Sequence, residues 1–228
     1  MKTMLARRDL LLAGLAASML TALPVLTTTA RAEAKDALPE GGARLDPRQV
    51  QFLFADLQPT VLPLSRTVPP EALGRSAAAL AKVATILEIP MLFSVVPQGE
   101  VPSTVIDELR PYATAANTVR RTLAGPFMDP PTAAAVAASG RRTMVVAGVA
   151  TEVAVLHAVL DAVAAGYSVH YVVDAIGGLS ERTEAAAMRH MEHVGAVPTS
   201  VLSLTTRLTP DFFSPPGSET FEAVKPLL

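Results

Sequence analysis

The sequence of 228 residues contains no cysteine and no tryptophan, and aromatic residues make up only 4% of it. The absence of cysteine excludes disulfide bonds, thiolate metal sites and a thiol nucleophile. The scarcity of aromatic side chains leaves little surface for stacking on nucleic-acid bases. The net charge is −2, so the chain also lacks the basic surplus that binding to a phosphate backbone requires. We therefore expect no nucleic-acid partner.

Hydrophobic residues, by contrast, are plentiful. They make up 50% of the chain, while charged residues make up only 18%. This balance suits a well-filled core and argues against a disordered chain. A chain of this length can form one sizeable α/β domain, or at most two small domains.

The first 32 residues are typical of a bacterial export signal. Lys2, Arg7 and Arg8 form a basic start, an apolar run spans residues 10–26, and residues 30–32 give a small-x-small cleavage pattern. The adjacent arginines resemble a twin-arginine signal. The alternative is an uncleaved membrane anchor, but the apolar run is interrupted by polar residues, glycine and proline and is short for a span. We expect cleavage near Ala32, membrane contact only during export, and a periplasmic location.

The mature chain alternates short apolar runs with longer alanine-rich stretches, a pattern that predicts a parallel sheet covered by helices on both faces. Residues 33–47 are expected to form a leader, residues 48–204 the domain, and residues 205–228 a tail packed on the domain or on a neighbouring subunit. Strands are expected at 50–55, 89–96, 142–147, 168–174 and 197–204, and helices at 70–87, 132–139, 151–165 and 181–194.

In open parallel sheets, ligands bind beyond the carboxyl ends of the strands. This rule selects Asp56, the turn after Val96, the turn at 148–154, and Asp174 as candidate site residues. Partial burial could raise the pKa of Asp56 enough for general-base work, although an ordinary turn-capping role is equally favoured. The turn brings a helix N-terminus to the same edge, where free N–H groups favour an oxyanion. The alternative is an ordinary strand-to-helix turn with Thr151 as its N-cap.

Other polar residues give weaker evidence of a functional site. Arg120 and Arg121 lie in a predicted loop, where solvated surface charges are favoured over recognition of a carboxylate. His190 and His193 lie three residues apart on a predicted helix, but no further ligands accompany them, so we expect no metal site. The sequence contains no glycine-rich phosphate loop, and we expect no cofactor.

Three segments resemble the isochorismatase-like, or cysteine hydrolase, superfamily over residues 52–204. Phe52–Gln58 resembles the family's first strand, which ends in Asp-x-Gln. Val145–Val155 resembles the nucleophile turn, which is the most specific of the three motifs. Residues 164–175 resemble the helix-to-strand segment that follows. Within the superfamily, the chain resembles the small, ring-forming hydrolases of unknown substrate.

The resemblance implies an α/β three-layer sandwich built on a six-stranded parallel sheet with helices on both faces. It also implies a catalytic triad of Asp, Lys and Cys. The Asp maps to Asp56, the Lys to Arg121, six residues before Phe127, and the Cys to Ala154. Family members commonly form dimers, tetramers or larger rings, so we expect a homo-oligomer.

The family also has a non-proline cis peptide in the nucleophile turn, which would fall at Val149–Ala150. It would aim the N–H groups of Ala150 and Ala154 at one oxyanion. Substrate contacts are expected from Val149, Ala150, Thr151 and Phe127. Because Arg121 cannot shuttle a proton and Ala154 cannot form a thioester, covalent amide hydrolysis is not expected.

Two functions remain open at this point. The first is a hydrolase that acts on a small molecule without a thiol, with Asp56 as acid or base and the turn amides as the oxyanion site. The second is a catalytically inactive protein that binds a small ligand or serves as an oligomeric scaffold. Retention of Asp56 and the turn favours the first, and the changed triad favours the second.

Overall fold

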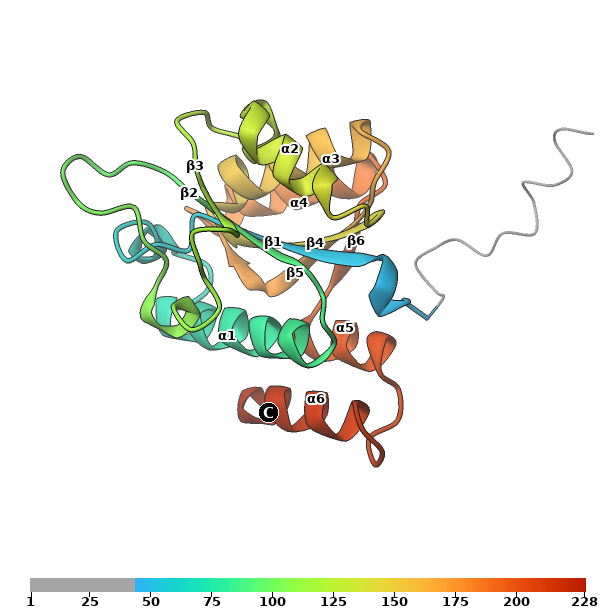
Figure 1. Cartoon of the computed structure of the whole chain (residues 1–228). Helices are drawn as coiled ribbons and strands as arrows, with labels where there is room; N and C mark the ends of the chain where they lie inside the picture. The colour runs from blue at the N-terminus through green and yellow to red at the C-terminus, as the bar shows by residue number, and fades with distance from the viewer. Residues whose placement is uncertain (1–43) are drawn as a thin grey trace, which may run out of the picture. The chain divides into compact units, whose positions relative to one another are not determined.

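The computed structural model describes residues 44–228. They form one six-stranded sheet, with the strand order β3-β2-β1-β4-β5-β6, in which all neighbouring strands run parallel (Figure 1). The strands are β1 (Val50–Ala55), β2 (Met91–Val95), β3 (Thr118–Arg120), β4 (Thr143–Val149), β5 (Ser168–Gly177) and β6 (Val197–Thr199). The helices are α1 (Pro70–Ile86), α2 (Pro130–Ala138), α3 (Leu156–Ala164), α4 (Glu181–His193), α5 (Val201–Leu208) and α6 (Gly217–Val224). The expected α/β fold is confirmed.

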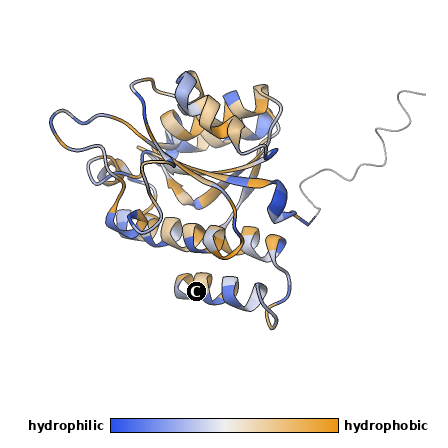
Figure 2. Cartoon of the chain, in the orientation of Figure 1, coloured by the Kyte–Doolittle hydropathy of each residue, from blue (hydrophilic) through white to orange (hydrophobic). Residues whose placement is uncertain are grey.

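Helices cover the sheet on both faces. Figure 1 shows α2, α3 and α4 on one face, α1 and α5 on the other, and α6 outside α1 and α5. Side chains of β1 alternate between the two layers, as strand geometry requires. Phe52 and Phe54 join the core beneath α1 and α5, whereas Leu53 joins the core beneath α2 and α3. Hydrophobic residues accordingly dominate the strands (Figure 2).

The expected strand at 197–204 is wrong beyond Thr199. The chain turns at Ser200, whose hydroxyl accepts a hydrogen bond from the N–H of Ser203 at 3.1 Å and so caps α5. The apolar residues that follow also fit a helix, since Val201, Leu204 and Leu208 all bury on one face. Residue 204, the expected domain boundary, therefore falls within α5. The tail adds a further helix, α6, which packs on α1 and α5.

Two other elements differ from expectation. Strand β3, at the edge of the sheet, occupies part of a predicted loop, because three residues flanked by polar neighbours give no clear apolar run. The helix expected from residue 151 begins instead as a π-helical turn (Thr151–Val155) that leads into α3. The predicted export signal lies outside the described residues. No helix in the described part of the chain is long and apolar enough to cross a membrane.

Candidate functional site

A buried ion pair lies at the carboxyl edge of the sheet. The two terminal nitrogens of Arg121 donate to the two carboxylate oxygens of Asp56, with Nη1–Oδ1 at 2.9 Å and Nη2–Oδ2 at 2.8 Å. Nη2 also donates to the carbonyl oxygen of Ala124 at 3.1 Å. Arg121 is only 1% exposed and Asp56 only 7% exposed. The expectation that Arg121 is a solvated surface charge is therefore wrong, because Asp56 lies 65 residues away in sequence and its proximity follows only from the fold.

Strand β2 holds both partners of this pair in place. The backbone N–H of Asp56 donates to the carbonyl oxygen of Ser94, and that of Arg121 donates to the carbonyl oxygen of Val95, each at 2.9 Å. Asp56 has a φ of 56°, a left-handed conformation that an aspartate adopts more readily than most residues. The backbone therefore turns sharply at the end of β1, where the Asp56 carboxylate lies.

Gln58, the last residue of the Asp-x-Gln segment, forms hydrogen bonds that hold this segment in place. Its amide nitrogen donates to the carbonyl oxygen of Val96 at 2.9 Å, and its amide oxygen accepts from the N–H of Val96 at 2.7 Å. This paired contact ties the loop after β1 to the end of β2. The loop after β1 is therefore held to β2 at two positions, Asp56 and Gln58.

The predicted cis peptide is present at Val149–Ala150. The turn lies next to β1, because Gly148 is the register partner of Ala55, the residue before Asp56. The Ala150 carbonyl accepts hydrogen bonds from Val153 and Val155, at 3.1 and 3.3 Å. The N–H of Ala154, which lies between them in sequence, does not donate to this carbonyl. Ala154 itself is 1% exposed.

Thr151 does not act as the N-cap that the sequence offered as an alternative. No side chain caps this turn at its N-terminus; the Thr151 hydroxyl instead donates to the Glu184 carboxylate of α4 at 2.8 Å, and both side chains are buried. The neighbouring Glu152 accepts from the N–H of Leu179 at 2.9 Å. Glu184 was missed from sequence because nothing in its helical surroundings distinguishes it from a solvent-facing glutamate. These contacts fasten the turn to the start of α4.

The electrostatics of Asp56 reflect two opposed effects. Burial raises the pKa of its carboxyl above the usual value, while the hydrogen bonds and charge of Arg121 oppose that shift. The pair as a whole is neutral. A carboxylate has more acceptor positions than the two that Arg121 occupies, so Asp56 can still accept a further hydrogen bond.

Two other sequence-based candidates make contacts outside the ion pair. The ring of Phe127 packs edge-on against Tyr167, which precedes β5, at 6.0 Å between centroids. The Asp174 carboxylate accepts from the N–H of Val201 at 2.9 Å and so supports the start of α5.

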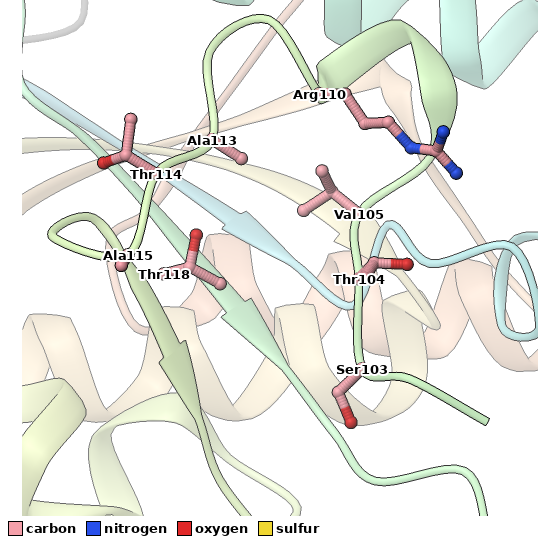
Figure 3. Close-up of a pocket in the computed structure, with 8 residues that line it drawn as sticks. All are labelled: Ser103, Thr104, Val105, Arg110, Ala113, Thr114, Ala115 and Thr118. Carbon is pink, nitrogen blue, oxygen red and sulfur yellow. The ribbon is translucent and has the colours of Figure 1, made fainter. Parts of the chain in front are cut away.

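A separate cavity of about 330 Å³ lies near the edge strand β3 (Figure 3). None of the predicted site residues lines it. Its walls come from the segment after β2 and from the approach to β3, and they consist of Ser103, Thr104, Val105, Arg110, Ala113, Thr114, Ala115 and Thr118. Its one cation, Arg110, is paired with Asp107 at 2.8 Å.

Comparison with known proteins agrees with this geometry. The model of the isochorismatase domain matches residues 52–202. The chain therefore belongs to the isochorismatase family. This family member is 27% identical over 159 residues to a probable hydrolase of Escherichia coli, YcaC, covering 67% of this chain and 74% of YcaC. It is 30% identical over 151 residues to isochorismatase domain-containing protein 2 of Rattus norvegicus, covering 65% and 69% of the two chains.

Solved structures of YcaC show the same fold. The Pseudomonas aeruginosa protein superposes with a TM-score of 0.74 at 26% identity, covering 80% of this chain and 92% of that one. The Escherichia coli protein, described as an octameric hydrolase of unknown specificity, gives the same TM-score and identity over 80% and 91% of the chains. The isochorismatase-like hydrolase fold of this chain is thus shown by sequence and structure alike.

Proposed function

We propose that this isochorismatase-family protein hydrolyses a small molecule without a thiol, using water as the nucleophile. The observation that carries the proposal is the Asp56–Arg121 pair, buried beside the Val149–Ala150 turn. Asp56 would take a proton from water, and the N–H groups of Ala150 and Ala154 would stabilise the oxyanion that forms when the water adds to a carbonyl. Asp56 would then return the proton to the leaving group.

A second candidate is supported by two specific contacts. Both oxygens of Asp56 already accept from Arg121, and the side chain at 154 is a buried methyl group. A carboxylate held in this way is less free to exchange protons. These contacts favour a catalytically inactive member that binds a small ligand or supports assembly.

Turnover assays on three proteins separate the two candidates. The mature wild type, Asp56→Asn and Ala154→Cys would be assayed against amides, esters and vinyl ethers, with folding checked by circular dichroism. Wild-type turnover that Asp56→Asn abolishes and Ala154→Cys does not raise is the result expected. Turnover that appears only in Ala154→Cys would refute the thiol-free route and support the inactive candidate. Wild-type turnover that survives in folded Asp56→Asn would refute the role of Asp56.

We also propose that the protein is exported to the periplasm and that its substrate is met there. The proposal is supported by Arg7, Arg8 and the apolar run that follows them. Replacing both arginines by lysine should leave uncleaved precursor in the cytoplasm, whereas the wild type appears in the periplasmic fraction. Equal distribution of the two proteins would contradict a twin-arginine route.

A homo-oligomer is supported by the octameric state given for Escherichia coli YcaC. Sedimentation velocity of the mature protein should show a single species at a multiple of the protomer mass. A monomer at all accessible concentrations would contradict assembly.

A further inference from the structure

Phe213 is the most exposed of the large hydrophobic residues in the described part of the chain, at 92%. It lies in the connection between α5 and α6 (Figure 1). Its neighbour Phe212 packs edge-on against Phe221 of α6, with 5.0 Å between the ring centroids. The Phe213 ring has no comparable cover from its own chain. Aromatic side chains left in water in this way are enriched at protein–protein interfaces.

Hydrogen bonds fix the backbone around Phe213. The Asp211 carboxylate accepts from the N–H groups of Phe213 and Ser214, at 2.8 and 3.2 Å. The Ser214 carbonyl in turn accepts from the N–H of Ser218 at 3.1 Å. Because this segment is ordered before a partner arrives, docking of the ring restricts little more than its two side-chain torsions.

A surface pocket of about 340 Å³ lies beside the same connection. Its walls come from the chain before β1, the ends of α1 and α5, and the connection itself. Leucine and proline side chains supply much of its apolar lining, namely Pro47, Leu87, Leu208, Pro210, Pro215 and Pro216. An apolar cavity of about 150 Å³ already holds a benzene molecule, so this pocket has room for a phenyl ring.

The exposed ring and the pocket together make one self-complementary surface. Asp211 and Ser214, which lie on either side of Phe213 in sequence, both line the pocket, so the two features are neighbours. A two-fold axis between them places the ring of each copy in the pocket of the other. Such a contact closes on itself and needs no second kind of partner. Arg44 also lines the pocket, and a guanidinium packs favourably on the face of a phenyl ring.

The area of this contact is in the range that pairing of two copies requires. One buried phenylalanine accounts for about 150–250 Å², so two rings and the walls they cover bury about 600–1,000 Å². A stable interface buries about 1,200–2,000 Å² in total. The two rings thus supply about half of a standard interface, and the surface around the pocket supplies the rest.

Pairing at this surface leaves the candidate functional site uncovered. Pro47, in the pocket wall, precedes β1, whereas Asp56 follows the other end of that strand. The six residues of β1 separate the two positions by about 20 Å at the normal rise of a strand. Substrate access at the carboxyl edge is therefore compatible with this contact.

We infer that Phe213 is the central contact of an interface between two copies of this chain, in which each ring fills the pocket of the other copy. This inference rests on the proposed homo-oligomer and names the surface through which its copies pair. It assigns two roles to the predicted tail, since α6 packs on its own domain and the connection before α6 contacts the neighbouring subunit.

Sedimentation velocity of the mature wild type and its variants tests this pairing, with folding checked by circular dichroism. Phe213→Ser removes the ring, and a side chain so exposed is not needed for folding. Loss of one central aromatic contact weakens association at least about tenfold, so loss of both should raise the dissociation constant about a hundredfold. Where the wild type is assembled, this variant should therefore sediment at half the wild-type mass or less.

Three further variants sharpen the test. Pro47→Trp fills the pocket from a different segment and should give the same smaller species as Phe213→Ser. Phe213→Leu keeps an apolar side chain and should stay assembled, with a dissociation constant within about tenfold of the wild type. Leu228→Ser is the matched control, because it removes another exposed apolar side chain, 75% accessible, at the far end of the tail. It should keep the wild-type mass.

Four results would overturn the inference. Phe213→Ser at the wild-type mass would refute this interface and leave the homo-oligomer standing, whereas a monomeric wild type would refute both. Dissociation by Phe213→Ser but not by Pro47→Trp would show that the ring does not enter the pocket. Equal dissociation by Leu228→Ser would show that the effect is not specific to Phe213. Turnover tests the hydrolase proposal separately, since none of these variants changes the carboxyl edge.

Discussion

Replacing Arg121 by methionine tests whether the ion pair supports the fold. Methionine keeps an unbranched apolar stem but lacks the guanidinium, so the Asp56 carboxylate stays buried without its cation. Removal of one partner from a buried pair costs about 3–5 kcal/mol, because the other charge remains uncompensated. For a domain of this size, that corresponds to a fall of about 6–20 °C in melting temperature.

The loss should depend on pH in a defined direction. Without Arg121, burial alone acts on Asp56 and raises its folded pKa further above the unfolded value of about 3.9. Between those two pKa values the folded variant binds a proton that the unfolded chain has released. Its stability therefore falls as pH rises through this window and recovers as pH falls. The difference from wild type should shrink between pH 7 and about pH 4.

Denaturant titrations at several pH values measure this difference. Arg110→Met is the matched control, because its pair with Asp107 is exposed, with side chains 63% and 77% accessible. It should change stability by no more than about 1 kcal/mol. The double variant Asp56→Leu/Arg121→Met should recover most of the lost stability, since it leaves no unpaired charge. A loss below about 1 kcal/mol in Arg121→Met, or one independent of pH, would refute the reasoning.

Two further substitutions test the turn by its unfolding free energy. Gly148→Ala should cost about 2–4 kcal/mol, because a Cβ there would collide with the carbonyl oxygen of Ala55, whereas Gly140→Ala, in open space, should cost about 1 kcal/mol. Equal losses at the two glycines would contradict the close approach. Thr151→Val should cost about 1–3 kcal/mol because Glu184 loses its buried donor, and a neutral result would show that water replaces the hydroxyl.

The sequence predicts the centre of the sheet better than its edges. Strands β1, β4 and β5 are buried between two helical layers, so they form apolar runs that are visible without a structure. Edge strand β3 has three residues and only intermediate burial or exposure, so no such run marks it. At β6 the apolar run continues into α5, and only the Ser200 cap separates the two elements.

The features of the candidate site also fall into two groups, those visible within one segment and those that depend on contacts between segments. Asp56 could be predicted from the end of one apolar strand, and the cis peptide from the family resemblance, which rests on a motif within one turn. The burial of Arg121 and the partner of Thr151 depend on contacts between segments distant in sequence. No composition or spacing argument could supply those contacts, since they follow from strand order.

The contacts that hold Asp56 in place are independent of residue 154, the position to which the resemblance assigns the nucleophile. Asp56 is held by the Ser94 carbonyl and by Arg121, and its loop by Gln58, while none of these contacts involves residue 154. Under the proposed correspondence between residue 154 and the family's cysteine, a methyl group at this position removes a reactive atom without removing any support for the carboxylate. The Ala154→Cys variant should therefore keep the geometry around Asp56, so its turnover and that of the wild type can be compared on one folded framework.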